Sequence, residues 1–199
     1  MPRSSREQAD QNRVAITEAS ARLFREHGIR GVSVADLMAA AGLTHGGFYG
    51  HFASKDALAA EACANAFARS TERWQRRVAD AADGAAARQA LIEPFLSAKA
   101  RASPGTSCPT VALAGDVARE PARAPVRAAF TAGVEGLVGV LSALPAGADA
   151  ADRRATALAD LATMVGALLL ARATAGQPVS DEFLAAARVR LLAPAPAGR

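Results

Sequence analysis

The segment LTHGGFYGHFASK, which runs from Leu43 to Lys55, decides how the N-terminal third of this chain folds. Phe48 and Phe52 lie four residues apart, so both fall on one face of a helix and give it an apolar side. Tyr49 projects away from that side and carries a hydroxyl at the end of a rigid ring. The segment is therefore expected to be a short helix with one face in a core and another free for polar contacts.

Polar and cationic residues flank this short helix. We expect the Thr44 side chain to cap its first turn by accepting a backbone N–H. His51 and Lys55 crowd its far end, where Ser54 caps the helix that follows. A short helix with an apolar face, a polar leading edge and cations behind it is suited to lie against a phosphate-lined groove.

A second helix is expected directly before it. Ser33 and Asp36 form a variant of the capping box, with Asp where Glu or Gln is usual. Four apolar residues then recur at helical spacing, and Gly42 ends the helix. These four are Val34, Leu37, Met38 and Ala41. Only Gly42 and Leu43 separate the two helices, which predicts a helix-turn-helix over residues 33–52 with the second helix as the reader.

The same residues resemble the signature of TetR/AcrR-type transcriptional regulators. The resemblance is carried by GVSVADL, which starts at Gly31, and by AGLTHGGFYGHFASKDAL, which ends at Leu58, and it covers residues 10–70. A Cys-Pro at the start of the expected sixth helix resembles one branch of that family. Two positions depart from the pattern: His45 stands where Lys or Arg is frequent, and Gly50 where a large residue is frequent. The resemblance implies DNA contacts, mostly to phosphates, at Ser33, Thr44, His45, Gly46, Gly47, Tyr49, His51 and Lys55.

Three glycines in the reader need an explanation of their own. Gly46, Gly47 and Gly50 each cost about 1 kcal/mol relative to Ala in a helix. Either the missing side chains let the backbone approach DNA closely, or the glycines are drift in a helix held by its phenylalanines. We favour close approach. Few side chains remain to read bases, so we expect affinity to depend on phosphates and specificity per half-site to be modest.

Composition favours helices throughout the 199 residues. Hydrophobic residues make up 51% of the chain but aromatic residues only 5%, and alanine dominates, which excludes a sheet protein. A formal charge of +4 permits a polyanionic partner. Two cysteines are too few for a disulfide framework, the N-terminus lacks a signal peptide, and the apolar run 161–171 falls short of a membrane span. We therefore expect a cytoplasmic protein that does not enter a membrane.

Breaks in the hydrophobic pattern divide the chain into about nine helices. Besides the helix-turn-helix pair, helices are expected over residues 10–27, 54–82, 85–101, 109–120, 125–143, 150–174 and 180–191. Residues 1–9 are either a frayed tail or a basic arm toward DNA, 144–147 a turn, and 194–199 a disordered tail. The prediction is an all-α protein with a three-helix DNA-binding domain at residues 10–70 and a helical effector-binding and dimerisation domain at residues 71–193.

The C-terminal domain carries more apolar residues than one small core needs. By the resemblance, a cavity there binds a small hydrophobic effector, and few charged residues are available for its wall. Its candidate lining residues are Phe67, Trp74, Phe95, Cys108, Phe130 and Met164. The last two helices are expected to form a four-helix bundle with a second copy. Its candidate interface residues are Leu158, Leu161, Val165, Leu168, Leu169, Leu184, Ala187 and Leu191.

Cys108 has two interpretations. It stands at the N-cap of a helix that begins with Pro109, where the helix dipole lowers the pKa of a thiol, so it is a candidate sensor of electrophiles or oxidants. Alternatively it packs as a small apolar residue, as we expect for Cys63. His45 and His51 are six residues apart and no Cys or carboxylate joins them, so we expect neither a metal site nor a cofactor.

These features predict a homodimeric regulator that binds a palindromic operator in double-stranded DNA and responds to a small-molecule effector. We expect a repressor released by a hydrophobic or electrophilic compound. One alternative is a DNA-binding regulator or activator without an effector. A remote alternative is a helical enzyme with Cys108 as nucleophile, although no histidine base, paired carboxylate or phosphate-binding loop accompanies that thiol. We therefore expect no enzymatic activity.

Overall fold

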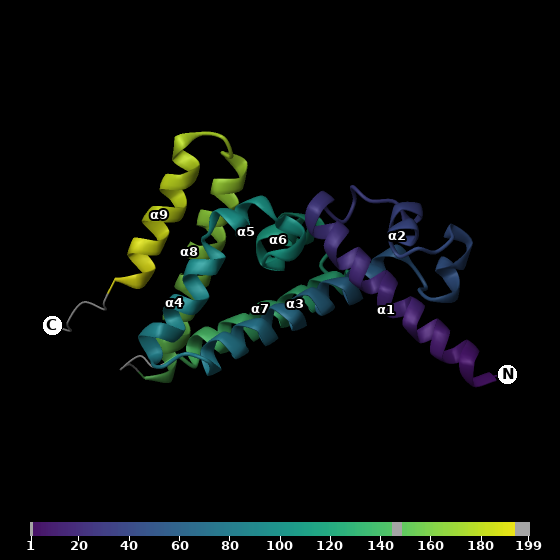
Figure 1. The fold of residues 1–199 in the computed structure, drawn as a ribbon, viewed down its shortest axis with the longest axis horizontal. Helices are drawn as coiled ribbons and strands as arrows, with labels where there is room; N and C mark the ends of the chain where they lie inside the picture. The colour runs from purple at the N-terminus through teal and green to yellow at the C-terminus, as the bar shows by residue number, and fades with distance from the viewer. Residues whose placement is uncertain (1, 145–148, 194–199) are drawn as a thin grey trace. The chain divides into compact units, whose positions relative to one another are not determined.

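The structure is a computed structural model that describes residues 2–144 and 149–193, with side chains from residue 6 onward. Every regular element in these residues is helical, which confirms the all-α prediction (Figure 1). The α-helices are α1 Pro2–His27, α2 Val34–Ala40, α3 Lys55–Ala79, α4 Gly84–Phe95, α5 Ala98–Ala102, α6 Pro109–Arg119, α7 Pro125–Ser142, α8 Ala150–Ala173 and α9 Pro178–Leu192. Two 3₁₀-helices, η1 His45–Gly50 and η2 Pro104–Thr106, lie between them.

The first helix starts earlier than the sequence pattern predicts. α1 begins at Pro2 rather than near Asp10, so the segment expected to be a frayed tail or an arm is helical. Proline is favoured at the first helical position, and the Arg, Glu, Gln and Ala that follow are good helix formers. The side chain of Arg3, the expected turn at 145–147 and the expected tail at 194–199 lie outside the described residues.

The helix expected over residues 85–101 is two helices. α4 ends at Phe95, with Pro94 in its last turn, because Leu96 and Ser97 leave the helical conformation. Ser97 then starts α5, since its hydroxyl accepts the N–H of Ala100 at 3.1 Å. The structure therefore has one more short helix in this region than the prediction.

The described residues form two compact units. The first unit contains the chain up to Ser70 together with Pro104–Val134, and the second contains Thr71–Ser103 and the chain from Glu135 onward. α3 and α7 each contribute to both units. They run side by side (Figure 1): the ring of Phe67 on α3 packs closely against Gly133 on α7, where a Cβ atom would have no room.

The first unit has a core made by the N-terminal helices. Ile16 and Phe24 of α1 are buried, as are Leu37 of α2, Phe48 of η1 and Leu58 of α3. α1 stops at His27 because Gly28 adopts a φ of 79°, which glycine accepts without a steric penalty. The three-helix module predicted from the sequence therefore forms around one shared core.

The second unit is built on α8 and α9, which pack against each other with α4 and α5 beside them (Figure 1). Its buried residues include Ile92 on α4, Met164 and Leu168 on α8, and Leu184 on α9. α8 is the one described helix whose length and composition would allow it to cross a membrane. Helices in the cores of water-soluble proteins pass the same test, and α8 buries Met164 and Leu168 fully inside this unit.

Candidate DNA-binding site

The start of α2 is held by the predicted capping box. The hydroxyl of Ser33 accepts the N–H of Asp36 at 3.1 Å, and a carboxylate oxygen of Asp36 accepts the N–H of Ser33 at 3.0 Å. The Ser33 hydroxyl also donates to that carboxylate, at 2.6 Å, and these bonds lower the pKa of Asp36 below its usual value. Ser33 is exposed, so its position at the helix end is open to a ligand.

The turn between α2 and the reader depends on Gly42. Its φ is 73°, a left-handed conformation that favours glycine. The N–H of Gly42 donates to the carbonyl of Ala39 at 3.0 Å, and the N–H of Leu43 donates to that of Met38 at 2.9 Å. This pair of bonds is a Schellman motif, which satisfies the last carbonyls of α2 and reverses the chain. The predicted helix-turn-helix is therefore present.

The reader is a 3₁₀-helix, and this corrects two expectations. η1 is held by backbone hydrogen bonds between residues three apart, such as the one from the N–H of Gly47 to the carbonyl of Thr44 at 3.1 Å. The Thr44 side chain makes no capping hydrogen bond, so that prediction is wrong. Six residues with three glycines give little support to an α-helix, and a tight 3₁₀ turn is common in such short pieces.

The reader has two faces. Phe48 and Phe52 are buried, and their rings stack with centroids 5.9 Å apart. Tyr49 leaves the core with 74% of its surface exposed, although its ring meets that of Phe48 in a T-shaped contact with centroids 5.2 Å apart. The predicted contact residues are distributed as follows: Ser33, Thr44, His45, Gly46, Gly47 and Tyr49 are exposed, and His51 and Lys55 are half-buried. Unit 1 therefore presents all eight to solvent at least in part.

The reader's glycines have no role inside the protein. A Cβ atom built on Gly46 or Gly50 would meet no atom within 4 Å, and one on Gly47 would meet only the methyl carbon of Met38 at 3.6 Å, an ordinary contact. None of the three has a positive φ. Packing and backbone conformation thus leave room for alanine at these positions, so no contact within the described chain requires glycine there.

One residue that supports the reader escapes the sequence pattern. Arg13 of α1 donates a hydrogen bond to the carbonyl of His51, pairs with Glu61 of α3 and lies over the ring of Phe52. Its partners are 38 and 48 residues away in the sequence. No local pattern could therefore identify it, whereas the folded module places it directly behind η1.

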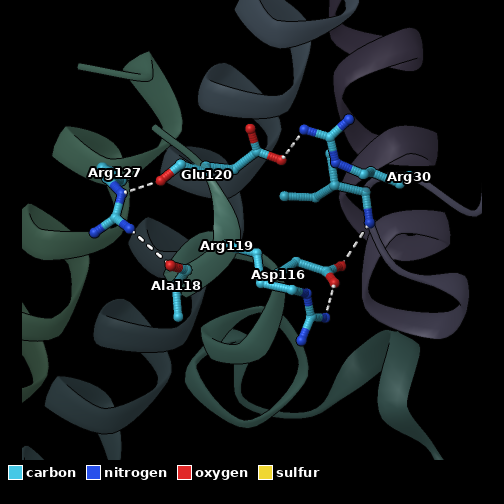
Figure 2. A network of polar contacts seen from close by, with 7 residues as sticks. Arg30, Asp116, Ala118, Arg119, Glu120 and Arg127 are labelled. Carbon is cyan, nitrogen blue, oxygen red and sulfur yellow. Dashed lines mark hydrogen bonds and ion pairs between the residues drawn. The ribbon is translucent and has the colours of Figure 1, made fainter. Parts of the chain in front are cut away.

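A polar network joins the end of α1 to the end of α6 (Figure 2). A carboxylate oxygen of Asp116 accepts the N–H of Ile29 at 2.8 Å, directly after the left-handed Gly28. Glu120 pairs with Arg30 at 2.8 Å, and Arg127 of α7 donates to the backbone carbonyl of Glu120 at 2.7 Å. The turn that leads into α2 is thus tied to α6 within the first unit.

The predicted effector-site residues fall in both units. In unit 1, Phe67 meets Phe130 edge to face with ring centroids 5.3 Å apart, and Cys108 is buried. In unit 2, Trp74 meets Phe95 at 6.1 Å, and Met164 is fully buried. Five of the six predicted residues are buried in their own units and Phe130 is half-buried, and an effector site at them remains a prediction.

The predicted dimer residues divide by exposure. Leu158 and Leu169 are exposed at 45% and 50%, and Val165 is half-buried. The other five are buried in the core of unit 2, because they are on the faces that α8 and α9 turn inward. These five are Leu161, Leu168, Leu184, Ala187 and Leu191. The large apolar residues that these helices expose are Leu158 and Leu169 of the predicted set and, besides them, Leu170, Val179 and Val189.

The two cysteines lie in different settings, and neither is in a disulfide bond. Cys108 is the N-cap residue of α6 with Pro109 following it, as predicted, and it is only 6% exposed. Burial raises the pKa of Cys63 to about 12. The described residues contain no group of three or more His, Cys, Asp or Glu arranged to hold a metal ion.

Residues 16–62 match the family described as bacterial regulatory proteins, tetR family. The fold is similar to that of a TetR transcriptional regulator from Chloroflexus aurantiacus, with 25% identity, 94% of each chain covered and a TM-score of 0.74. A TetR-family regulator from Cytophaga hutchinsonii is 21% identical. The match covers 93% of this chain and 94% of the regulator, with a TM-score of 0.76. The reduced form of NemR from E. coli is 20% identical to this chain. The match covers 90% of this chain and 94% of NemR, with a TM-score of 0.73.

No curated protein matches the sequence closely enough to count as a relative. The family match covers the segment that contains α2, the Gly42 turn and η1, which together form the helix-turn-helix described above. The whole-chain similarity adds the same order of helices around it. Residues 16–62 thus match the tetR family of bacterial regulatory proteins, and the fold of the whole chain is similar to that of the TetR-family regulators named above.

Proposed function

We propose that this protein is a homodimeric repressor that binds a palindromic operator and is released from it by a small hydrophobic or electrophilic effector. The observation that carries the DNA-binding part is the outer face of η1. That face combines an exposed Tyr49 with glycines whose missing side chains serve no purpose inside the protein. A backbone without side chains can approach phosphates and base edges more closely than any other.

The chemistry of this face favours phosphates over bases. In η1 and its N-cap residue, the exposed residues other than glycine are Thr44, His45 and Tyr49. Ser33 at the start of α2 and Lys55 at the start of α3 flank it. Helix starts and cations are the usual partners of phosphate oxygens. We therefore expect strong salt dependence and modest specificity per half-site.

Dimerisation would raise the affinity for DNA above the low value expected for one short reader on one half-site. α8 and α9 expose five large apolar residues, which a second copy can cover as a four-helix bundle. Two readers held one helical turn of DNA apart bind a palindrome, and linking them multiplies the affinity of each. The apolar interface proposed here therefore consists of Leu158, Leu169, Leu170, Val179 and Val189.

Regulation requires a conformational link between effector and reader. α3 starts next to the reader and continues without interruption to Ala79, so a shift of this helix changes the position of η1. Asp116 and Glu120 of the α6 segment hold the turn before α2 and offer a second link. We infer that an effector favours a conformation with a different spacing of the two readers. Trp74, the only tryptophan, is a fluorescent reporter for effector binding at the candidate residues.

Cys108 is the candidate for electrophile sensing. It is the N-cap residue of α6, the helix that carries Asp116, so a modified thiol would act on the segment tied to the reader module. The expected result is that electrophiles release wild-type protein from DNA and leave the Cys108→Ser variant bound. If Cys108→Ser is released by every active electrophile as readily as wild type, the sensor role is lost while a non-covalent effector remains open.

The test of DNA binding is selection of genomic fragments by the purified protein, followed by affinity measurements on the selected site. A regulator of this kind should recover a palindromic site, and the logarithm of its affinity should fall steeply with the logarithm of salt concentration. We expect this protein to act in the cytoplasm, where the operator is. A protein that recovers no fragment, or whose affinity hardly changes with salt, contradicts the proposal.

A further inference from the structure

The reader cannot fix its own orientation. η1 has six residues, three of them glycine, and its backbone bonds are the short-range bonds of a 3₁₀-helix. Such a segment forms only where the surrounding structure holds it. Phe48 and Phe52 anchor one face in the core. Two neighbouring aromatic anchors leave the segment free to rock about the line between them, so a third fixed point is needed.

Arg13 supplies a fixed point at the C-terminal end of η1. Its guanidinium donates to the backbone carbonyl of His51, the residue that closes the helix. The same group lies over the ring of Phe52, with 4.3 Å between its central carbon and the ring centroid. The C-terminal end of a helix carries partial negative charge, and an aromatic face attracts cations. Both contacts therefore favour the charged guanidinium of Arg13.

Glu61 fixes the arginine in turn. One carboxylate oxygen of Glu61 pairs with Arg13, and the other accepts the hydroxyl hydrogen bond of Thr17 at 3.0 Å. Thr17 is buried on α1, and Glu61 is on α3. Arg13 on α1 is therefore fixed to α3 through Glu61 while it donates a hydrogen bond to the backbone of the reader at His51. We call these three residues, Arg13, Thr17 and Glu61, the reader clamp.

We propose that Arg13 is a positioning residue for DNA recognition: through the reader clamp it sets the direction in which η1 and its exposed Tyr49 face the operator. This inference rests on the proposed DNA binding and names a residue outside the helix-turn-helix. Only a planar fork with several donors reaches the His51 carbonyl and the Glu61 carboxylate at once, so lysine cannot replace arginine fully.

A direct phosphate contact by Arg13 is the rival explanation, since its side chain is 43% exposed. The two explanations differ in sign at Glu61. Removing this carboxylate makes the module more positive, which strengthens binding if only charge matters. If the reader clamp positions η1, Glu61→Ala weakens operator binding instead, because Arg13 loses the partner that holds it.

The experiment compares full-length wild type with Arg13→Gln, Arg13→Lys and Glu61→Ala on the selected operator and on unrelated DNA. Arg22→Gln is the matched control, because Arg22 is also on α1 and forms only a surface pair with Glu26. We expect Arg13→Gln and Glu61→Ala to lose about tenfold or more in operator affinity and much less on unrelated DNA. Arg13→Lys should fall between wild type and Arg13→Gln, and Arg22→Gln should lie within about threefold of wild type on both DNAs.

Two readouts separate positioning from unfolding and from phosphate contact. Tyr49 and Trp74 are the only tyrosine and tryptophan, so their NMR signals report separately on the reader and on the second unit. Arg13→Gln should shift the Tyr49 ring signals and leave the Trp74 indole signal in place. Operator affinity unchanged in Glu61→Ala, or a salt slope reduced by about one in Arg13→Gln with equal loss on all DNA, would overturn the inference. Wild type that binds no DNA would instead refute the proposed function.

Discussion

At the scale of single residues, Gly50 is the most informative position, because the protein itself has room for a side chain there. Alanine at this site should leave the free energy of unfolding unchanged or raise it by about 0.5–1 kcal/mol, since glycine is the poorer helix former. We expect Gly50→Ala to lose about tenfold in operator affinity, because the added methyl group keeps the backbone away from DNA. Chemical denaturation and fluorescence anisotropy measure the two effects.

Gly139 on α7 is the control for this substitution. It is exposed, and a Cβ atom there also meets nothing within 4 Å. Gly139→Ala should therefore change stability in the same direction as Gly50→Ala and leave DNA affinity unchanged. If Gly50→Ala binds the operator as tightly as wild type, the glycines of the reader are sequence drift rather than a requirement of the interface.

Cys63 gives a second prediction at this scale. Burial raises the pKa of Cys63 to about 12, so the residue stays a protonated thiol at pH 8, and its side chain is buried as well. A thiol reagent should leave Cys63 unmodified in the native protein and modify it after unfolding. Mass spectrometry of digested protein identifies the labelled residue, and a Cys63→Ala variant should keep the native labelling rate of Cys108. Fast labelling of native Cys63 would contradict its burial.

The sequence predicts residues whose partners are near in the chain. The spacing of Phe48 and Phe52 places both in the core and leaves Tyr49 exposed, as observed. Arg13 and Glu61 are different, because their importance arises only when α1, α3 and η1 come together. Polar contacts over such distances in the chain leave no periodic pattern in one sequence.

At the scale of elements, local rules predict most helix boundaries. Ser33 with Asp36, Gly42 and Pro109 each begin or end a helix where the sequence indicates. The exceptions are the 3₁₀ form of η1, the start of α1 at Pro2 and the break between α4 and α5. The first two lie where competing preferences differ by little: glycines weaken the reader, while ordinary helix formers extend α1. Pattern alone does not decide such cases.

The α1–α6 network of Figure 2 gives the prediction for this scale. Asp116→Ala removes the acceptor of the Ile29 N–H and leaves that donor unpaired at a residue only 5% exposed. A lost hydrogen bond to a charged acceptor should lower the free energy of unfolding by about 1.5–3 kcal/mol. Urea denaturation followed by circular dichroism measures this change.

Arg119→Gln is the control for the network. It removes the exposed partner of Asp116, at 2.9 Å, and keeps the bond to Ile29. Surface ion pairs of this kind contribute about 0–1 kcal/mol, so Arg119→Gln should cost much less than Asp116→Ala. Equal stability of Asp116→Ala and wild type would mean that water replaces the carboxylate and that the network does not hold the turn before α2.

At the scale of the whole molecule, exposed apolar residues gather on two helices. Seven large hydrophobic residues of the described chain are exposed, and five of them belong to α8 or α9. The sequence predicts an interface on these helices, but five of the eight residues that it selects are buried on their inward faces. Hydrophobicity marks both faces of α8 alike, and only the packing of α9 and α4 against it decides which leucines remain free.

The dimer proposal predicts a change of mass on introducing charge into that exposed set. Wild type should sediment at about twice 20.3 kDa, and Leu169→Glu together with Val189→Glu should sediment near 20.3 kDa, because a desolvated carboxylate opposes association. Val14 on α1 has a side chain of similar exposure, so Val14→Glu is the matched control and should stay dimeric. The monomeric variant should keep its helical circular dichroism and lose about a hundredfold or more in operator affinity, since it binds one half-site at a time. A Leu169→Glu/Val189→Glu protein that still sediments as a dimer would move the interface away from α8 and α9.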